Sequence, residues 1–204
     1  MSEYSKTTEA WRCDDCGADM VTPLFCDSCG TDYPERRGFS AFAILGLPVT
    51  YAQDDDAVEA LELAIARRLH PDKWLGKGER LHKRALIAQS AVNEAFGAVS
   101  SPFRRASTLL ELMEAPESPK PPQAFLIEQL ELMEEIEDGV DAPRKKTLQK
   151  LIRGELRALK ARLREAFLAA EAGNESALID GRMALDRSRY WRNAKRALRG
   201  AAPE

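Results

Sequence analysis

Apolar side chains recur at intervals of three and four residues over most of this chain, which is the spacing of one face of an α-helix. The clearest stripe lies between residues 81 and 99 and consists of Leu81, Ala85, Ala88, Val92, Ala95 and Val99. A second stripe, over residues 54–70, consists of Val58, Leu61, Ile65 and Leu69. Three aspartates precede it, where carboxylates favour a helix N-terminus. The two segments are expected to form antiparallel helices joined by a turn near Pro71.

The C-terminal half has the same periodicity in three further segments. They run over residues 124–138, from about residue 143 to 173, and over about residues 175–198. The middle segment carries Leu148, Ile152, Leu159, Leu163 and Phe167 on one face. Short connections between amphipathic helices favour an antiparallel bundle. No alternating strand pattern occurs outside the cysteine-containing segment, so the predicted fold class is all-α.

Two breaks in the pattern divide the chain. The first is YPERRG, residues 33–38, and the second is APESPKPP, residues 115–122, where four prolines in eight residues exclude a continuous helix. The expected parts are a small cysteine module (1–38), a helical domain (39–114), a Pro-rich linker (115–123) and a C-terminal helical bundle (124–204).

The four cysteines lie in two similar stretches near the N-terminus. They are CDDCG, the first knuckle (residues 13–17), and CDSCG, the second knuckle (residues 26–30). A two-residue gap lets both thiolates of a pair reach one tetrahedral ion, and two such pairs make a closed structural zinc site. We therefore expect Cys13, Cys16, Cys26 and Cys29 to bind one structural zinc ion in a zinc-ribbon-like module. Disulfides, unrelated thiols and rubredoxin-style iron remain alternatives.

Charge is distributed unevenly along the chain although the net charge is only −3. Residues 111–143 carry 1 basic and 10 acidic side chains, and residues 144–203 carry 16 basic and 6 acidic ones. Such neighbouring segments either neutralise each other between helices or form two binding faces. No apolar run approaches the ~20 residues that span a bilayer, and the N-terminus lacks the features of a secretion signal. We expect a cytoplasmic monomer with no membrane contact.

The turn between the two middle helices reads LHPDKW, residues 69–74. Proline disfavours helix at the preceding residue, so His70 is expected to end a helix and Asp72 to lie in a loop. There a carboxylate is free to meet a cation of a partner. An HPD motif between two antiparallel helices resembles the J-domain co-chaperones. Together with QSAVNEAFGAVSSPFRRASTLLEL and FLIEQLELMEEIED, it resembles the HscB-type J-proteins of iron–sulfur cluster assembly over residues 39 to about 198.

This resemblance implies a J-domain helical hairpin followed by a three-helix bundle. It also implies a non-enzymatic co-chaperone that delivers an IscU-type iron–sulfur scaffold protein to a DnaK/HscA-type ATPase chaperone and stimulates its ATP hydrolysis. In such a protein Asp72 would pair with a chaperone arginine, and the cysteine knuckles resemble those of the longer, metal-binding family members. The expected chaperone-binding residues are Arg67, Arg68, His70, Pro71, Asp72 and Lys73.

The segment 124–138 carries apolar side chains on two faces when it is drawn as a helix. One face is a core-facing stripe made of Phe125, Gln129, Leu132, Met133, Ile136 and Val140. The other face mixes apolar and acidic side chains, and an exposed apolar patch rimmed by charge is typical of a protein contact. The alternative is that a neighbouring helix covers this face. In the family this segment binds the scaffold with an aromatic residue of the last helix, which Tyr190 matches. The predicted scaffold-binding residues are Leu126, Ile127, Leu130, Glu131, Glu134, Asp138 and Tyr190.

The competing hypothesis is a zinc-ribbon nucleic-acid-binding protein that uses the basic C-terminal helices to contact phosphates. The same cations could instead be neutralised internally, because Arg153, Arg157 and Arg164 lie at helical spacing beside the acidic segment, as does Lys160. Nothing in the sequence favours an enzyme, since LGKGE lacks the full phosphate-loop pattern and no serine–histidine motif is recognisable. We expect no catalytic residue and no nucleic-acid partner.

Overall fold

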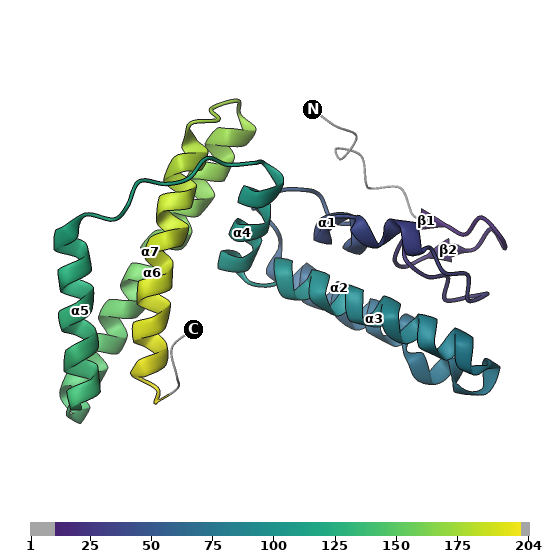
Figure 1. Ribbon diagram of the computed structural model, residues 1–204, viewed down its shortest axis with the longest axis horizontal. Coiled ribbons are helices and arrows are strands. Elements are labelled where there is room, and N and C mark those ends of the chain that lie inside the picture. Colours follow the sequence, from purple (N-terminus) through teal and green to yellow (C-terminus); the bar gives the residue numbers. More distant parts are fainter. Residues whose placement is uncertain (1–10, 201–204) are drawn as a thin grey trace. The chain divides into compact units, whose positions relative to one another are not determined.

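The computed structural model describes residues 11–200, which fall into two compact units (Figure 1). The first unit ends at Leu112 and the second begins at Met113. Both are built mainly from helices, which confirms the predicted all-α fold class. Within residues 11–200, no helix is both long enough and apolar enough to cross a bilayer.

The first unit begins with a short two-stranded ribbon and continues as helices. The ribbon pairs β1 (Trp11–Arg12) with β2 (Asp19–Met20) in antiparallel register. The helical elements that follow are, in chain order, the 3-10 helix η1 (Pro34–Gly38), α1 (Ala41–Leu45), α2 (Asp55–Leu69), the 3-10 helix η2 (Pro71–Lys77), α3 (Glu79–Val99) and α4 (Pro102–Leu112). The helices α2 and α3 are the hairpin that the sequence predicts, and η2 forms the turn between them.

The central element of the first unit is α3, which packs against α1, α2, η2 and α4. Its predicted apolar stripe is confirmed, because five of the six positions are buried and Leu81 is half-buried. The matching stripe of α2 is buried at Val58, Ile65 and Leu69. The N-terminus of α2 is capped by Asp54, whose carboxylate accepts hydrogen bonds from the backbone N–H groups of Asp56 and Ala57.

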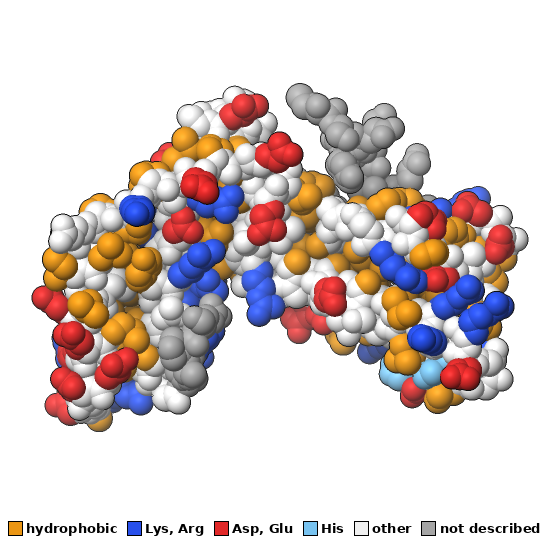
Figure 2. Space-filling model, in the orientation of Figure 1, with side chains coloured by type: hydrophobic (Ala, Val, Ile, Leu, Met, Phe, Trp, Pro, Cys, Tyr) orange, Lys and Arg blue, Asp and Glu red, His pale blue; other side chains and the backbone are white. Residues whose placement is uncertain are grey.

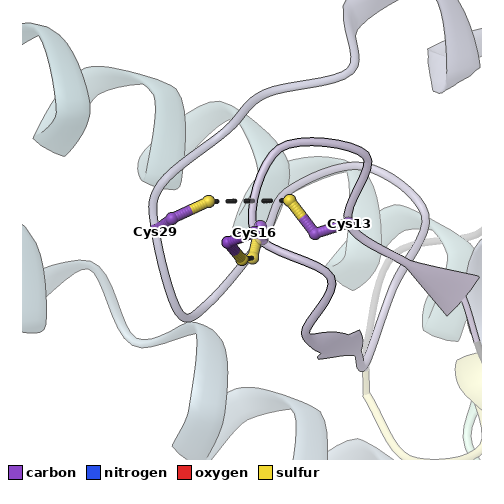
Figure 3. Close-up of side chains that lie close together, drawn as sticks. Cys13, Cys16 and Cys29 are labelled. Carbon is purple, nitrogen blue, oxygen red and sulfur yellow. Dashed lines mark hydrogen bonds between the residues drawn. The ribbon is translucent and has the colours of Figure 1, made fainter.

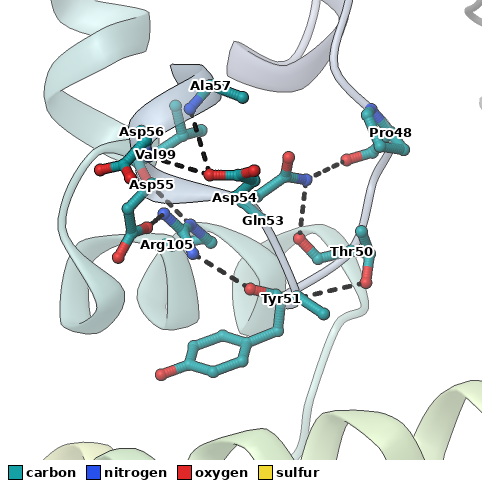
Figure 4. Close-up of polar contacts among 11 residues, drawn as sticks. Pro48, Thr50, Tyr51, Gln53, Asp54, Asp55, Asp56, Ala57, Val99 and Arg105 are labelled. Atoms are coloured by element: carbon teal, nitrogen blue, oxygen red, sulfur yellow. Dashed lines mark hydrogen bonds and ion pairs between the residues drawn. The ribbon is translucent and has the colours of Figure 1, made fainter. Parts of the chain in front are cut away.

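A buried arginine of α4 connects the end of α3 to the start of α2 (Figure 4). Arg105, in α4, is only 3% exposed. Its guanidinium donates to the carbonyl oxygens of Val99 at 2.8 Å and Tyr51 at 3.1 Å, and to Asp55 Oδ1 at 2.6 Å. A buried charge is costly unless it is paired and hydrogen-bonded, and these three acceptors satisfy it. The contact fixes the start of α4 against the end of α3 and the start of α2.

The cysteine-containing segment packs directly on the helices of the first unit. Leu24 and Phe25 are fully buried, and the Thr22 hydroxyl donates to the Ile44 carbonyl oxygen at 3.2 Å. The segment therefore shares a core with the helical domain and belongs to the same compact unit. The division expected at residue 38 remains a prediction.

The second unit consists of α5 (Gln123–Asp138), α6 (Ala142–Glu171) and α7 (Ala177–Ala197). The two longest helices, α6 and α7, lie side by side along most of their length, and α5 packs against α7. All five apolar positions predicted for α6 are buried, as is Leu156. The helix bounds differ from the predicted ones by one or two residues. Asp141 caps the start of α6. Gly139 follows the end of α5 and Gly173 the end of α6, both with positive φ angles.

Candidate functional site

The four cysteine thiols converge at one point of the first unit (Figure 3). All four Sγ atoms lie within 4.8 Å of one another, with 3.5 Å between Cys13 and Cys29 and 3.7 Å between Cys16 and Cys26. A tetrahedral zinc ion with Zn–S distances of about 2.3 Å separates its sulfurs by about 3.8 Å. All four cysteines are free thiols. The cluster therefore fits one metal ion better than it fits disulfides.

The two knuckles have the same backbone design. In each, the glycine N–H donates to the carbonyl oxygen of the first cysteine at 2.9 Å, from Gly17 to Cys13 and from Gly30 to Cys26. Both glycines have positive φ angles, 71° and 84°, which other L-residues rarely adopt. This turn is what brings the two thiols of each C-x2-C pair to one side.

Hydrogen bonding prepares one of the thiols for metal binding. The Tyr33 hydroxyl donates to Cys13 Sγ at 3.4 Å and lowers the pKa of the Cys13 thiol to about 6. Burial raises the pKa of Tyr33 to about 12, so the tyrosine stays a hydrogen-bond donor. Burial also raises the pKa of Cys26, but a coordinating metal deprotonates its thiol ligands. The four residues suit a thiophilic divalent ion in a structural role.

The HPD motif lies at the exposed end of the helical hairpin. His70 ends α2, and Pro71 begins η2. The side chains of His70 and Asp72 are 56% and 69% exposed, with His70 Nδ1 3.6 Å from Asp72 Oδ2. The backbone N–H of Asp72 donates to the same ring nitrogen at 3.3 Å. The Asp72 backbone N–H thus orients the His70 ring, and both side chains are accessible to another protein.

The basic residues around this motif have different surroundings. Arg67 is exposed on α2, and Lys73 donates to the Arg68 carbonyl oxygen at 3.3 Å. The guanidinium of Arg68 contacts the cysteine segment, donating to Asp27 Oδ2 at 2.7 Å and to the Asp19 carbonyl oxygen at 3.1 Å. Arg68 is therefore engaged within the chain, which its position in the sequence did not indicate.

The outer side of α5 carries a patch that mixes apolar and acidic side chains, which we call the α5 face. Its apolar members are exposed by 37% at Leu126, 48% at Ile127 and 59% at Leu130. Glu131, Glu134 and Asp138 are also exposed. Figure 2 shows hydrophobic side chains interleaved with acidic ones over this helix. The opposite stripe is turned inward, with Gln129, Leu132 and Ile136 buried, so within the described chain no neighbouring helix covers the α5 face.

Tyr190 contacts the beginning of α5 from α7. It is half-buried, and its ring meets that of Phe125 edge to face, with centroids 5.4 Å apart. Phe125 directly precedes Leu126, so Tyr190 lies next to one end of the α5 face. The sequence indicated both aromatic residues but not their contact.

The sequence did not predict two contacts of the HPD loop (residues 70–78). His82 Nδ1 lies 3.2 Å from the Pro71 carbonyl oxygen, and the Trp74 ring packs edge to face against Phe25, with centroids 5.0 Å apart. The only available signal was composition, since Trp74 is one of three tryptophans in the chain. Neither contact can be read from helical periodicity, because the partners lie in separate elements.

Comparison with known proteins identifies the family. Residues 121–199 match the family model described as the HSCB C-terminal oligomerisation domain. The chain is 34% identical over 142 residues to the co-chaperone protein HscB homolog of Cupriavidus taiwanensis, which covers 67% of this chain and 80% of that relative. It is 32% identical over 131 residues to the corresponding homolog of Chromobacterium violaceum, covering 62% of this chain and 75% of the relative.

Solved structures show the same fold. The crystal structure of human co-chaperone HscB superposes with a TM-score of 0.74 at 19% identity and covers 92% of this chain and 96% of the human one. Chaperone HscB from Vibrio cholerae gives a TM-score of 0.63 at 23% identity, covering 79% and 96%. The curated relatives of this chain are co-chaperone proteins. The chain belongs to the HscB family of co-chaperones.

Proposed function

We propose that this protein delivers an IscU-type iron–sulfur scaffold protein to a DnaK/HscA-type ATPase chaperone and stimulates the chaperone's ATP hydrolysis. The observation that carries the proposal is that a member of the HscB family presents two separate exposed surfaces. One is the HPD motif at the end of the helical hairpin, and the other is the α5 face of the C-terminal bundle. Two surfaces on one chain suit a protein that brings two partners together.

In this proposal the HPD motif triggers the chaperone without performing chemistry. Asp72 offers an exposed carboxylate to a chaperone arginine, because Pro71 turns the chain and His70 holds the Asp72 backbone N–H. Arg67, Arg68 and Lys73 give this end of the hairpin a positive charge, which suits an acidic chaperone surface. Arg68 contributes less free charge than Arg67, because its guanidinium pairs with Asp27.

The α5 face binds the scaffold in this proposal. Leu126, Ile127 and Leu130 supply apolar contacts, and Glu131, Glu134 and Asp138 form an acidic rim that selects a basic counterpart. A buried apolar centre surrounded by a charged rim is the usual organisation of a specific protein interface. Tyr190, which packs against Phe125 next to one end of the α5 face, belongs to the same scaffold-binding surface. Residues 39–114 thus serve the chaperone and residues 124–204 serve the scaffold, with 115–123 as the linker.

The cysteine module holds one zinc ion in this proposal. Four thiolates in two C-x2-C pairs form a closed donor set, which is the usual form of a structural zinc site rather than a catalytic one. The ion links the two knuckles and so joins residues 13–17 to residues 26–30.

The test is an ATPase assay with a purified DnaK-type chaperone and the purified protein. The wild type should stimulate hydrolysis, and adding the scaffold should increase the effect. Asp72→Asn should abolish stimulation, whereas Asp56→Asn, which removes another exposed carboxylate of the same unit, should not. Normal stimulation by the Asp72→Asn variant would refute the role of the motif. Salt-sensitive nucleic-acid binding without ATPase stimulation would favour the competing hypothesis.

A further inference from the structure

The second knuckle lies against the residues that follow the HPD motif. Phe25, which directly precedes Cys26, is fully buried and meets Trp74 edge to face, with centroids 5.0 Å apart. Trp74 is itself 2% exposed and belongs to η2, only two residues beyond Asp72. Aromatic pairs of this kind stabilise beyond their buried area. The conformation of η2 therefore depends on a residue some fifty positions earlier in the chain.

The glycine of the second knuckle approaches the same tryptophan closely. A Cβ atom at Gly30 would lie 2.8 Å from Trp74 Cζ3 and 3.0 Å from Leu81 Cδ2. The equivalent glycine of the first knuckle, Gly17, has nothing within 4 Å of the same position. The two knuckles thus share a backbone design, but only the second is fitted against the helical hairpin.

The second knuckle also contacts the residues that precede the motif. Asp27 lies between the two cysteines of this knuckle, and its side chain, 9% exposed, pairs with Arg68 at 2.7 Å. Arg68 also donates to the Asp19 carbonyl oxygen at 3.1 Å. The knuckle therefore touches the chain on both sides of the HPD motif, at Arg68 before it and at Trp74 after it.

We propose that the second knuckle positions the HPD loop, so that filling of the four-cysteine site controls how well the loop is ordered for the chaperone. The proposal rests on the proposed function of that loop. It makes Asp27, Phe25 and Gly30 positioning residues, since they act through Arg68 and Trp74 and do not touch the partner. The metal site is thereby part of the chaperone-contacting surface and not a separate appendage.

The physical reason is that a small metal module folds with its ion. A segment of this kind gains its ordered structure from metal binding, and without the ion its knuckles lose their common anchor. Trp74 and Arg68 would then lose their contacts with the knuckle together. Loops have the lowest local stability in a fold, so residues 70–78 should respond before the helices do.

The experiment compares Gly30→Ala with Gly17→Ala in the full chain. Both changes place a side chain at a positive φ angle in a knuckle, so both strain the metal site, but only the first presses on Trp74. Amide hydrogen exchange over residues 70–78 is measured with metal content recorded in parallel. Gly30→Ala should accelerate exchange about tenfold relative to Gly17→Ala. The added methyl group presses on the rigid Trp74 ring, and overpacking of this kind destabilises the folded loop by a free energy that corresponds to roughly this ratio. It should also lower chaperone stimulation.

A second pair avoids changing the knuckle backbone. Asp27→Asn removes the partner of Arg68, and Asp19→Asn removes an exposed carboxylate that pairs with Arg12 at the module surface. The Asp27 variant should accelerate exchange over residues 70–78, and the Asp19 variant should match the wild type. Removing the metal from the wild-type chain with a chelator should produce the same change as Gly30→Ala, or a larger one.

The proposal is overturned if the metal-free chain, or Gly30→Ala, exchanges residues 70–78 at the wild-type rate. That result differs from a failure of the proposed function. If the wild-type protein stimulated no DnaK-type ATPase, the function would be wrong, while the exchange measurements would still decide whether the knuckle orders the loop.

Discussion

The two surfaces that we assign to partners are built in different ways. The HPD loop is held by long-range contacts such as that of Trp74 with Phe25, and Arg68, just before the loop, pairs with Asp27, which is 41 residues away in the chain. The α5 face is the outer side of a single helix, and it needs only that helix and the inward stripe of Gln129, Leu132 and Ile136. A surface of the first kind can be lost through changes elsewhere in the fold. A surface of the second kind is changed mainly by substitutions within it.

The largest expected effect is a loss of metal and of ordered structure in the first unit and not in the second. Replacing Cys26 and Cys29 together by serine removes half of the metal ligands, and the metal content should fall from about one ion per chain to near zero. The knuckles should unfold and residues 70–78 should lose protection, while α5, α6 and α7 keep theirs. Elemental analysis and hydrogen exchange measure both results. Ser28→Ala, which leaves all four ligands in place, is the control, and loss of protection in α6 or α7 would contradict the comparison.

The next effect tests how strongly the first unit depends on a single buried contact. Arg105→Met removes the guanidinium that donates to the Val99 and Tyr51 carbonyl oxygens and to the Asp55 carboxylate. The Tyr51 oxygen keeps the Gln53 backbone N–H as a donor, and the Asp55 side chain is exposed to water. It should destabilise the first unit by about 3 kcal/mol, the upper end for hydrogen bonds made by a charged group, because a buried charged donor is lost. Denaturant unfolding followed by tryptophan fluorescence measures the change.

Arg104→Met is the matched control for this substitution, because Arg104 is the exposed neighbour of Arg105 on α4. Its effect should be within about 0.5 kcal/mol of zero. Equal effects of the two substitutions would mean that the buried network does not stabilise the unit as we expect.

A smaller effect should appear at the α5 face. Replacing Leu126, Ile127 and Leu130 together by alanine removes apolar surface that is already exposed, so the fold should be unaffected. Scaffold binding should weaken by about 2 kcal/mol, or roughly thirtyfold in Kd, if these residues form the centre of the interface. Isothermal titration calorimetry measures the affinity. Replacing Leu151 and Leu168 together by alanine is the control, because these leucines of α6 are also exposed, by 46% and 47%.

The smallest effect concerns pH and the junction between α5 and α6. Arg144 donates to both carboxylate oxygens of Glu135, at 2.5 and 2.8 Å, and this hydrogen bonding lowers the pKa of Glu135. A carboxyl group with a lowered pKa contributes stability above its usual pKa and loses that contribution as the pH falls through the folded value. The thermal midpoint of unfolding of the second unit should therefore be slightly lower below pH 5 than at pH 5.

Glu135→Gln should flatten this pH dependence, because the glutamine does not titrate. Glu137→Gln, on the exposed side of the same helix, should leave it unchanged. The side chains of Glu135 and Arg144 are 36% and 49% exposed, so solvent screens their interaction and the effect stays small. A midpoint that is independent of pH in the wild type would show that the pair does not stabilise the junction.

Much of the fold could be predicted because periodicity reports which side of a helix is buried. The stripes of α2, α3 and α6 are inward as predicted, and the helix bounds agree to within one or two residues. The same reasoning separated the two sides of α5, with Leu130 outward and Leu132 inward. Likewise, the C-x2-C spacing predicted that four thiols would meet at one point. Each of these features depends on residues close together in the chain.

Other features could not be predicted because they depend on which element packs against which. Arg105 follows Arg104 in the sequence, and only the fold makes one of them buried and the other exposed. Arg68 reads as a cation available to a partner, yet its guanidinium is bound to Asp27.

By itself, the sequence determined the main helices, the inward sides of α2, α3, α5 and α6, the four-cysteine cluster and the HPD turn. Local spacing decides all of these, because a regular helix or a tight turn brings nearby residues to a fixed side. Only the tertiary structure decided that the second knuckle, and not the first, lies against Trp74 and Arg68. Two glycines in nearly identical motifs differ in this respect solely through their surroundings, with Trp74 beside Gly30 and open space beside Gly17.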